Sequence, residues 1–252
     1  MPAAGRLHDL ARQVIGAPNW IRRLQVRPLL HLLDVRPGLR LLDIGCGQGW
    51  LTAEFARIGA WAVGLDLAAD RFWSSWAERD LSMLLGRAEA LPLAAVAVDR
   101  ILASSLLQLV EEPAQVLCEC RRVVRPGGRL VFSVSAPFPR LLARYPAAEL
   151  RRRLQALFHT RGVIWFTRDE LAALLERTGW RPVEWWQSPG PRAARVWEIA
   201  LDRALRCGRQ PSLKRMFFAL YPPLARDCGG PAPQGIPPHA GEWLVAAVPV
   251  RA

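Results

Sequence analysis

The sequence feature that most constrains the fold is a glycine cluster placed directly after a short apolar segment. Residues 39–44 are largely apolar, which is typical of a strand buried on both faces of a parallel sheet. Residues 45–49 (GCGQG) follow at once, and a helical pattern begins near Trp50. Alternate glycines permit a tight strand-to-helix turn and let a ligand approach the backbone. The segment therefore predicts a ligand-binding turn at the carboxyl end of the first strand.

Strand-like and helix-like segments alternate beyond this turn. The strand-like segments are 60–65, 99–104, 129–135, 182–187 and 242–250, and the helix-like segments are 50–58, 70–84, 112–124 and 167–178. This alternation is typical of βαβ units, which build a parallel sheet with right-handed crossovers. Thr167 and Glu170 are spaced as a capping box at the start of the last of these helices. The sequence thus predicts an α/β fold with a doubly wound sheet.

Three segments depart from this alternation. Residues 1–38 have the apolar spacing of two short helices that end before Pro37 and Gly38. Residues 136–163 combine several prolines with a basic helix, and residues 188–241 form a long stretch with helical patterns near 192–206 and 212–220. Long segments of this kind inside a compact domain are usually functional.

Two carboxylates accompany the glycines. The spacing is Gly-x-Gly-x-Gly, whereas nicotinamide dinucleotide-binding proteins use Gly-x-Gly-x-x-Gly, which argues against an oxidoreductase. Asp66 ends the second strand, where a carboxylate can accept hydrogen bonds from both ribose hydroxyls of a nucleoside. Asp43, just before the glycines, adds a negative charge that favours a cationic cofactor over a pyrophosphate.

The string LLDIGCGQGWLTAEFARIGAWAVGLDLA resembles the nucleotide-binding half of class I methyltransferases that use S-adenosylmethionine (SAM). GRAEALPL resembles the adenine loop of that family, and VDRILASSLLQLVEEPAQVLCECRRVVRPGGRLVFSV resembles its fourth strand, next helix and fifth strand. TRDELAALLERTGW resembles the helix that follows. The likeness covers roughly residues 39–135 and 164–187 and is closest to the branch of small-molecule and ubiquinone/menaquinone methyltransferases.

The resemblance implies a single domain over residues 1–252, with a Rossmann-like, doubly wound sheet of seven strands whose last strand is antiparallel. Residues 1–38 would form an N-terminal helical cap, and residues 39–135 the SAM-binding half. The lid insertions would be 136–163 and 188–241, and the remaining core sheet 164–187 and 242–250. The implied activity is methyl transfer from SAM to an O, N or C atom of a small, hydrophobic or aromatic acceptor.

The resemblance also assigns cofactor-binding roles by position. Gly45, Cys46, Gly47 and Gly49 would line the methionine and ribose of SAM, with Asp43 anchoring the loop. Asp66 would hold the ribose hydroxyls, and Leu67 would pack on the adenine. The full set of expected SAM contacts is Asp43, Gly45, Cys46, Gly47, Gly49, Asp66, Leu67, Arg87, Ala88, Glu89, Ser104, Ser105 and Gln108. Ser104 and Ser105 would flank the methionine, and Gln108 would face the methyl group.

One residue departs from the family pattern. The adenine loop usually reads Asp-Ala-Glu, and here it reads Arg87-Ala88-Glu89. A guanidinium has only donors, so Arg87 cannot accept from the adenine amine, and Glu89 or a water would have to replace that contact while Ala88 offers its backbone N–H. Arg87 therefore keeps a second hypothesis open, a non-catalytic binding or regulatory protein on the same fold.

No catalytic base or metal site stands out. His159, Tyr145, Tyr221 and His239 are candidate bases, although such residues are more often structural. The four histidines and five cysteines are too dispersed for a metal site or a disulfide framework. A general base is required only when the acceptor must lose a proton.

The net charge of +12 favours anionic partners. The arginines are scattered, however, and the sequence carries no RNA-binding motif, so an RNA methyltransferase is the weaker alternative and we expect no nucleic-acid partner. The basic and aromatic segment from Lys214 to Leu224 could rest on a membrane surface. The amino-terminal residues lack the apolar stretch of a signal peptide, which predicts a cytoplasmic protein.

Overall fold

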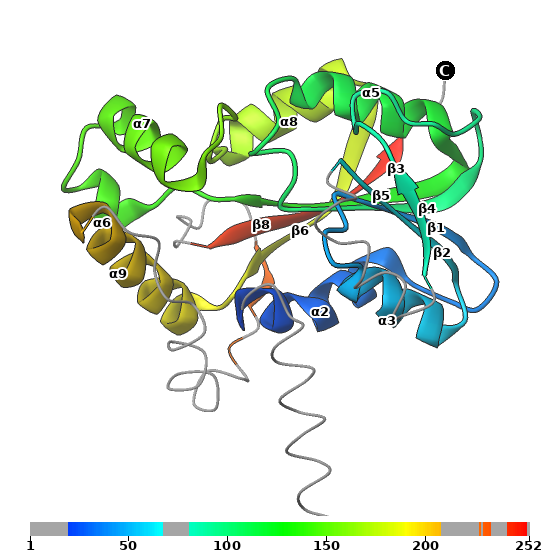
Figure 1. Ribbon diagram of the computed structural model, residues 1–252, viewed down its shortest axis with the longest axis horizontal. Coiled ribbons are helices and arrows are strands. Elements are labelled where there is room, and N and C mark those ends of the chain that lie inside the picture. Colours follow the sequence, from blue (N-terminus) through cyan, green and yellow to red (C-terminus); the bar gives the residue numbers. More distant parts are fainter. Residues whose placement is uncertain (1–19, 68–80, 208–226, 228, 233–240, 251–252) are drawn as a thin grey trace, which may run out of the picture.

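The structure is a computed structural model that describes residues 20–67, 81–207, 227, 229–232 and 241–250 (Figure 1). The strands are β1 (Arg40–Ile44), β2 (Trp61–Asp66), β3 (Ser82–Leu85), β4 (Val98–Ser104), β5 (Val124–Ser135), β6 (Trp180–Ser188), β7 (Gly230–Pro231) and β8 (Glu242–Pro249). The helices are α2 (Trp20–Leu33), α3 (Trp50–Ile58), α5 (Pro113–Val123), α6 (Pro139–Leu142), α7 (Ala147–Phe158), α8 (Arg168–Arg177) and α9 (Pro191–Cys207).

The strands form one mixed sheet in the order β3-β2-β1-β4-β5-β8-β6-β7. The pairs from β3 through to β5 are parallel. Strand β8 is antiparallel to both of its neighbours, β5 and β6. This arrangement confirms the doubly wound α/β sheet with an antiparallel last strand. The eighth strand, beyond the seven expected, is the two-residue β7, which extends the edge beside β6.

Helices cover both faces of the sheet. Helices α5 and α8 lie on one face, and α2 and α3 on the other (Figure 1). Each layer encloses an apolar core: Phe132 and Trp180 belong to the first, and Phe55 and Leu102 to the second. The alternation of buried strands with amphipathic helices produces this three-layer architecture.

A third apolar cluster holds the helices at one end of the sheet together. Helices α6, α7 and α9 pack around Phe138, Leu150, Leu154, Trp165 and Leu201 (Figure 1). The chain reaches α6 from the carboxyl end of β5 and α9 from the carboxyl end of β6. We call this group of three helices the lid. Within the described residues, these helices fall inside the segments 136–163 and 188–241, where helical insertions were expected.

Several local expectations can be compared directly with the structure. The capping box of α8 is present, because the Thr167 hydroxyl accepts from the Glu170 backbone N–H and the Glu170 side chain accepts from the Thr167 N–H. Between the expected helix 112–124 and the expected strand 129–135, residues 125–128 form a bulge within β5, where the register against β4 shifts.

The prediction of a helix over 70–84 is wrong at its carboxyl end. Residues 82–85 form β3, which pairs in parallel with β2. An edge strand is only half buried and lacks the strongly apolar pattern of a central strand, so its apolar residues also fit a helical spacing. The helix expected near 212–220 and the first of the two expected near the amino terminus lie outside the described residues.

Within the described residues, no helix is both long enough and apolar enough to cross a bilayer.

Candidate functional site

The glycine loop after β1 has the backbone geometry that its sequence predicts. Gly45, Gly47 and Gly49 have φ angles of 70°, 53° and 71°, in the left-handed region where side chains are disfavoured. The N–H groups of Gly45 and Cys46 both donate to the Leu65 carbonyl, at 2.7 and 3.1 Å. This pair of bonds ties the loop to the carboxyl end of β2, so the loop and Asp66 form one edge of the site.

Asp66 is hydrogen bonded directly to the glycine loop. Its Oδ2 accepts from the Gly47 N–H at 2.8 Å. This contact fixes the orientation of the carboxylate, and an ionised carboxylate has about four acceptor positions, so it can accept more than one hydrogen bond. The structure thus brings together two of the residues expected to hold one nucleoside.

Asp43 lies in β1 just before the glycine loop, and Cys46 lies in the loop itself. The buried Asp43 carboxylate accepts from the Thr52 hydroxyl of α3 at 2.7 Å, which fixes the first turn of that helix behind the glycines. Burial, together with the carboxylates of Asp43 and Asp66, raises the pKa of the Cys46 thiol above its usual value. A thiol whose pKa is raised in this way is a poor nucleophile.

The expected adenine loop follows β3. Ala88 is buried, and the Arg87 guanidinium forms an ion pair with Glu89 at 3.4 Å. The Arg87 side chain is mostly exposed, so it extends along the surface of the loop rather than into it. Leu67, expected to pack on the adenine, is 62% exposed at the end of β2. An apolar side chain exposed to this degree beside Asp66 is free to cover a flat ring.

Three serines, from β4, from the residue after it and from β5, lie together near the tip of β4. The Ser104 and Ser105 hydroxyls each lie 3.3 Å from the Ser133 hydroxyl on β5. The Ser105 N–H donates to Ser133, and Ser105 has a left-handed φ of 49°. Such a backbone conformation is uncommon outside glycine and is often found at functional sites.

A carboxylate that the sequence did not single out completes this tip. Glu242, the first residue of β8, accepts from the Ser105 hydroxyl at 2.6 Å and from the Gln25 side chain of α2 at 3.1 Å. Because β8 runs opposite to its neighbours, its amino-terminal residue arrives at the carboxyl ends of β4 and β5. No local pattern could have identified Glu242 or Gln25, since they are 217 positions apart.

Gln108 lies in the loop after β4 and is held there by the segment that follows α7. Its backbone carbonyl accepts from the Ile164 N–H at 3.1 Å, and the next carbonyl, that of Leu109, accepts from the Thr160 hydroxyl at 2.8 Å. The Gln108 side chain is 6% exposed, and its Oε1 has no hydrogen-bond partner among the described residues. A buried acceptor without a partner is costly unless a ligand supplies the donor.

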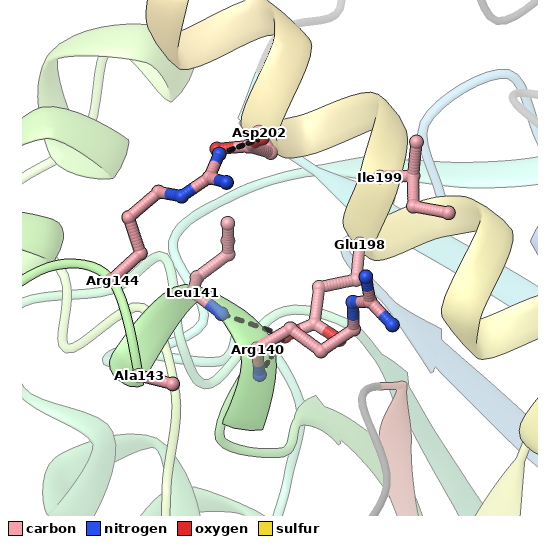
Figure 2. A pocket seen from close by; sticks show the side chains of 7 residues that line it. All are labelled: Arg140, Leu141, Ala143, Arg144, Glu198, Ile199 and Asp202. Carbon is pink, nitrogen blue, oxygen red and sulfur yellow. Dashed lines mark hydrogen bonds and ion pairs between the residues drawn. The ribbon is translucent and has the colours of Figure 1, made fainter.

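A pocket of about 290 Å³ lies between α6 and α9 in the lid (Figure 2). Its polar groups are engaged with one another: Arg144 pairs with Asp202 at 2.6 Å, and Glu198 accepts from the backbone N–H groups of Arg140 and Leu141. None of the expected SAM contacts lines it. The pocket is therefore part of the lid and not the cofactor site.

Two of the four candidate bases, His159 and Tyr145, lie within the described residues, and the contacts of both are structural. His159 is exposed and ends α7 in a left-handed conformation. The Tyr145 hydroxyl donates to Asp202 at 3.3 Å, within the lid. Tyr221, His239 and the segment Lys214 to Leu224 lie outside the described residues. Over the part of the chain that the structure describes, no group of three metal-ligating side chains occurs.

Comparisons with known proteins identify methyltransferases, the family that the sequence resembles. Residues 42–132 match a family described as a methyltransferase domain. A demethylmenaquinone methyltransferase from Mycolicibacterium vanbaalenii is 31% identical over 201 residues, which are 71% of this chain and 84% of that protein. A ubiquinone biosynthesis O-methyltransferase from Dinoroseobacter shibae is 32% identical over 151 residues, covering 56% of this chain and 59% of its own length.

The fold is shared with solved methyltransferase structures. Geranyl diphosphate C-methyltransferase from Streptomyces coelicolor A3(2) superposes with a TM-score of 0.61 at 19% identity, covering 90% of this chain and 78% of its own. The family match, the methyltransferase relatives and the glycine loop agree, and they support a methyltransferase over the non-catalytic and oxidoreductase alternatives. The chain belongs to the class I SAM-dependent methyltransferases and uses S-adenosyl-L-methionine as its cofactor.

Proposed function

We propose that this methyltransferase acts on a small hydrophobic acceptor that carries a hydroxyl group, such as a quinol-like or phenolic ring. The observation that carries the proposal is the buried Gln108 Oε1, for which the described residues provide no donor. An acceptor hydroxyl placed there would donate to it. The apolar lid beside this loop and the quinone-pathway names of the relatives support the same class of acceptor.

The cofactor residues have distinct roles in the proposal. When bound, SAM supplies a methyl group already activated by its sulfonium sulfur. The glycines of the loop would let the nucleoside approach the backbone closely, and Asp66 would accept from its ribose hydroxyls. Asp43 holds the loop in place from beneath through Thr52. Leu67, Ala88 and Glu89 contact the adenine, and the Arg87–Glu89 ion pair orients the carboxylate of Glu89.

The acceptor side is organised around the tip of β4. Ser104 and Ser105 would lie next to the methionine portion, and Gln108 would orient the acceptor so that its nucleophilic atom faces the methyl group, with water taking up the proton that this atom loses. Such alignment, with exclusion of water by the lid, is the main contribution that a protein makes to transfer from an activated donor.

Calorimetric titration with SAM and its demethylated product tests the cofactor site. Asp66→Ala is expected to weaken binding by about 10- to 100-fold, because hydrogen bonds to a charged group contribute about 1.5–3 kcal/mol. Asp169→Ala, an exposed carboxylate at the start of α8, is the matched control and should bind normally. Equal affinity in both variants would contradict the assignment of Asp66.

Transfer of a labelled methyl group tests the acceptor class. Label should pass into an organic extract when quinol or phenolic acceptors are supplied, and Gln108→Leu should raise the KM for such acceptors without changing SAM affinity. Label found in added RNA, with none in the quinol or phenolic products, would overturn the proposal in favour of the RNA alternative.

A further inference from the structure

The outer side of α9 carries a single stripe of arginines with an isoleucine at its centre. Arg192, Arg195, Ile199, Arg203 and Arg206 follow one another at intervals of three or four residues. At about 100° of rotation per residue, these five positions fall within an arc of roughly 80°. All five side chains are exposed, and Ile199 is 50% exposed.

The opposite side of α9 is apolar, and both acidic residues of the helix face the rest of the lid. Ala194 and Leu201 are buried in the lid core. Glu198 is 3% exposed and accepts from two backbone N–H groups of α6, and Asp202 pairs with Arg144 of the α6–α7 connection (Figure 2). Both acidic residues of α9 thus contact groups inside the lid, and neither belongs to the outer stripe, whose charged residues are all arginines.

Most arginines of the stripe lack a local counter-charge. Arg206 reaches Asp202 at 3.1 Å, but Arg192, Arg195 and Arg203 form no ion pair with any residue that the structure describes. Helix α7 differs in this respect, because Arg151 stacks on Trp165 and Arg153 pairs with Glu149. The basic surface is therefore concentrated on α9, although α7 contains three consecutive arginines.

We propose that the arginine stripe of α9 docks the lid onto the surface of a membrane that contains anionic phospholipids. Guanidinium groups bind lipid phosphates with several hydrogen bonds. A stripe of side chains along the exposed face of a helix can contact a flat membrane surface over its whole length. Each arginine held near an anionic membrane increases binding by roughly five-fold.

The composition of the stripe favours a membrane over a nucleic acid. Ile199 lies among the arginines, where an interfacial layer can bury its side chain and a phosphate backbone cannot. The stripe contains no aromatic side chain on which bases could stack. Docking through the lid also agrees with the proposed hydrophobic acceptor, which would be found in the membrane, but it does not depend on that proposal.

Co-sedimentation with lipid vesicles tests the docking, in the absence of SAM and acceptor, so that its outcome is independent of the catalytic proposal. The full chain is mixed with phosphatidylcholine vesicles that contain either no phosphatidylglycerol or about 30% of it. The second composition resembles an anionic membrane. The test variant is Arg192→Glu, Arg195→Glu and Arg203→Glu combined. The matched control is Arg27→Glu, Arg177→Glu and Arg181→Glu, which changes the net charge equally at exposed positions on other elements.

Wild type and the matched control are expected to bind the anionic vesicles and to bind less as salt rises, whereas the α9 variant should lose roughly 100-fold in partitioning. Ile199→Ser should weaken binding by a smaller factor. Unchanged thermal unfolding and SAM titration would show that the α9 variant is folded. Equal losses in the two triple variants, no vesicle binding by wild type, or α9-dependent binding to poly-uridine without binding to vesicles would each overturn the proposal.

Discussion

The Ser105 hydroxyl donates a 2.6 Å hydrogen bond to Glu242, which joins the tip of β4 to the first residue of the antiparallel strand β8. The same carboxylate accepts from Gln25 of α2, so three elements meet at one group. The position of α2, which covers one face of the sheet, is thereby linked to the position of Ser105 beside the expected methionine portion of SAM. Removal of this carboxylate should affect both stability and catalysis.

Glu242→Ala is expected to lower the free energy of unfolding by about 1–3 kcal/mol, because buried polar groups lose a charged acceptor. For a chain of this size the unfolding temperature should fall by roughly 2–4 °C per kcal/mol, as measured by calorimetry. Glu112→Ala removes an exposed carboxylate that makes no capping hydrogen bond and should leave the unfolding temperature unchanged. If the two variants unfold at the same temperature, the link through Glu242 contributes nothing to stability.

Gly162→Ala should disturb catalysis while leaving cofactor binding intact. A Cβ at Gly162 would lie 2.6 Å from the carbonyl carbon of Leu109, well inside van der Waals contact, and would displace the loop that holds Gln108. Misplacement of a positioning residue lowers kcat on the order of 10- to 100-fold. Gly230→Ala is the control, because a Cβ there meets no atom within 4 Å. Normal kcat in Gly162→Ala would show that the loop tolerates the shift.

The stability of the lid should depend on pH through Glu198. Burial raises the pKa of this carboxyl, although the hydrogen bonds from Leu141 and Arg140 act in the opposite direction. A carboxyl with a raised folded-state pKa favours the native state most when it is protonated, and that contribution is lost as the pH rises through the folded pKa. Glutamine cannot ionise, and it can retain both backbone hydrogen bonds, since both reach Oε1.

Glu198→Gln should therefore unfold at the same temperature as wild type near pH 4.5, and at a higher temperature than wild type near pH 7–8. Parallel thermal scans from pH 4.5 to pH 8 would measure the difference. Glu112→Gln, on the exposed surface, should show no such trend. A constant difference across the pH range would mean that the Glu198 carboxyl does not titrate within it.

The cysteines should separate into reactive and unreactive groups. Burial raises the pKa of the Cys46 and Cys120 thiols, so both remain protonated at pH 8. Cys118 and Cys207 are exposed. Brief treatment with iodoacetamide at pH 8, followed by peptide mass spectrometry, should find label on Cys118 and Cys207 and little on Cys46 or Cys120. Rapid labelling of Cys46 would show that the glycine loop opens readily.

Sequence reasoning predicted the parts of the fold that depend on local chemistry. The turn at residues 45–49 and the capping box of α8 each follow from residue types at fixed spacings, and both occur in the structure. Strand β3 was missed because pairing with β2, and not its own pattern, makes residues 82–85 extended. Tertiary pairing overrides local preference most easily at such short edge strands.

The acceptor side of the site was less accessible to sequence reasoning. The family resemblance placed Gln108 among the SAM contacts, facing the methyl group, but its support by Thr160 and Ile164 depends on contacts between distant segments. Glu242 looks like an ordinary charged residue at the start of a strand. Its role emerges only when the reversal of β8 brings it to Ser105, since a pattern read along the chain carries no information on which strands become neighbours.

The reversal of β8 also makes the site sensitive to strand register. Glu242 is opposite Ser135 on one side and Ser188 on the other, and the Gly241 carbonyl accepts from the Ala136 N–H at 2.9 Å. A slip by a single residue would turn every β8 side chain to the other face of the sheet and would present Trp243 to Ser105 in place of a carboxylate. In related proteins that keep this carboxylate, insertions and deletions should therefore occur before residue 241 and not between residue 241 and the end of the strand.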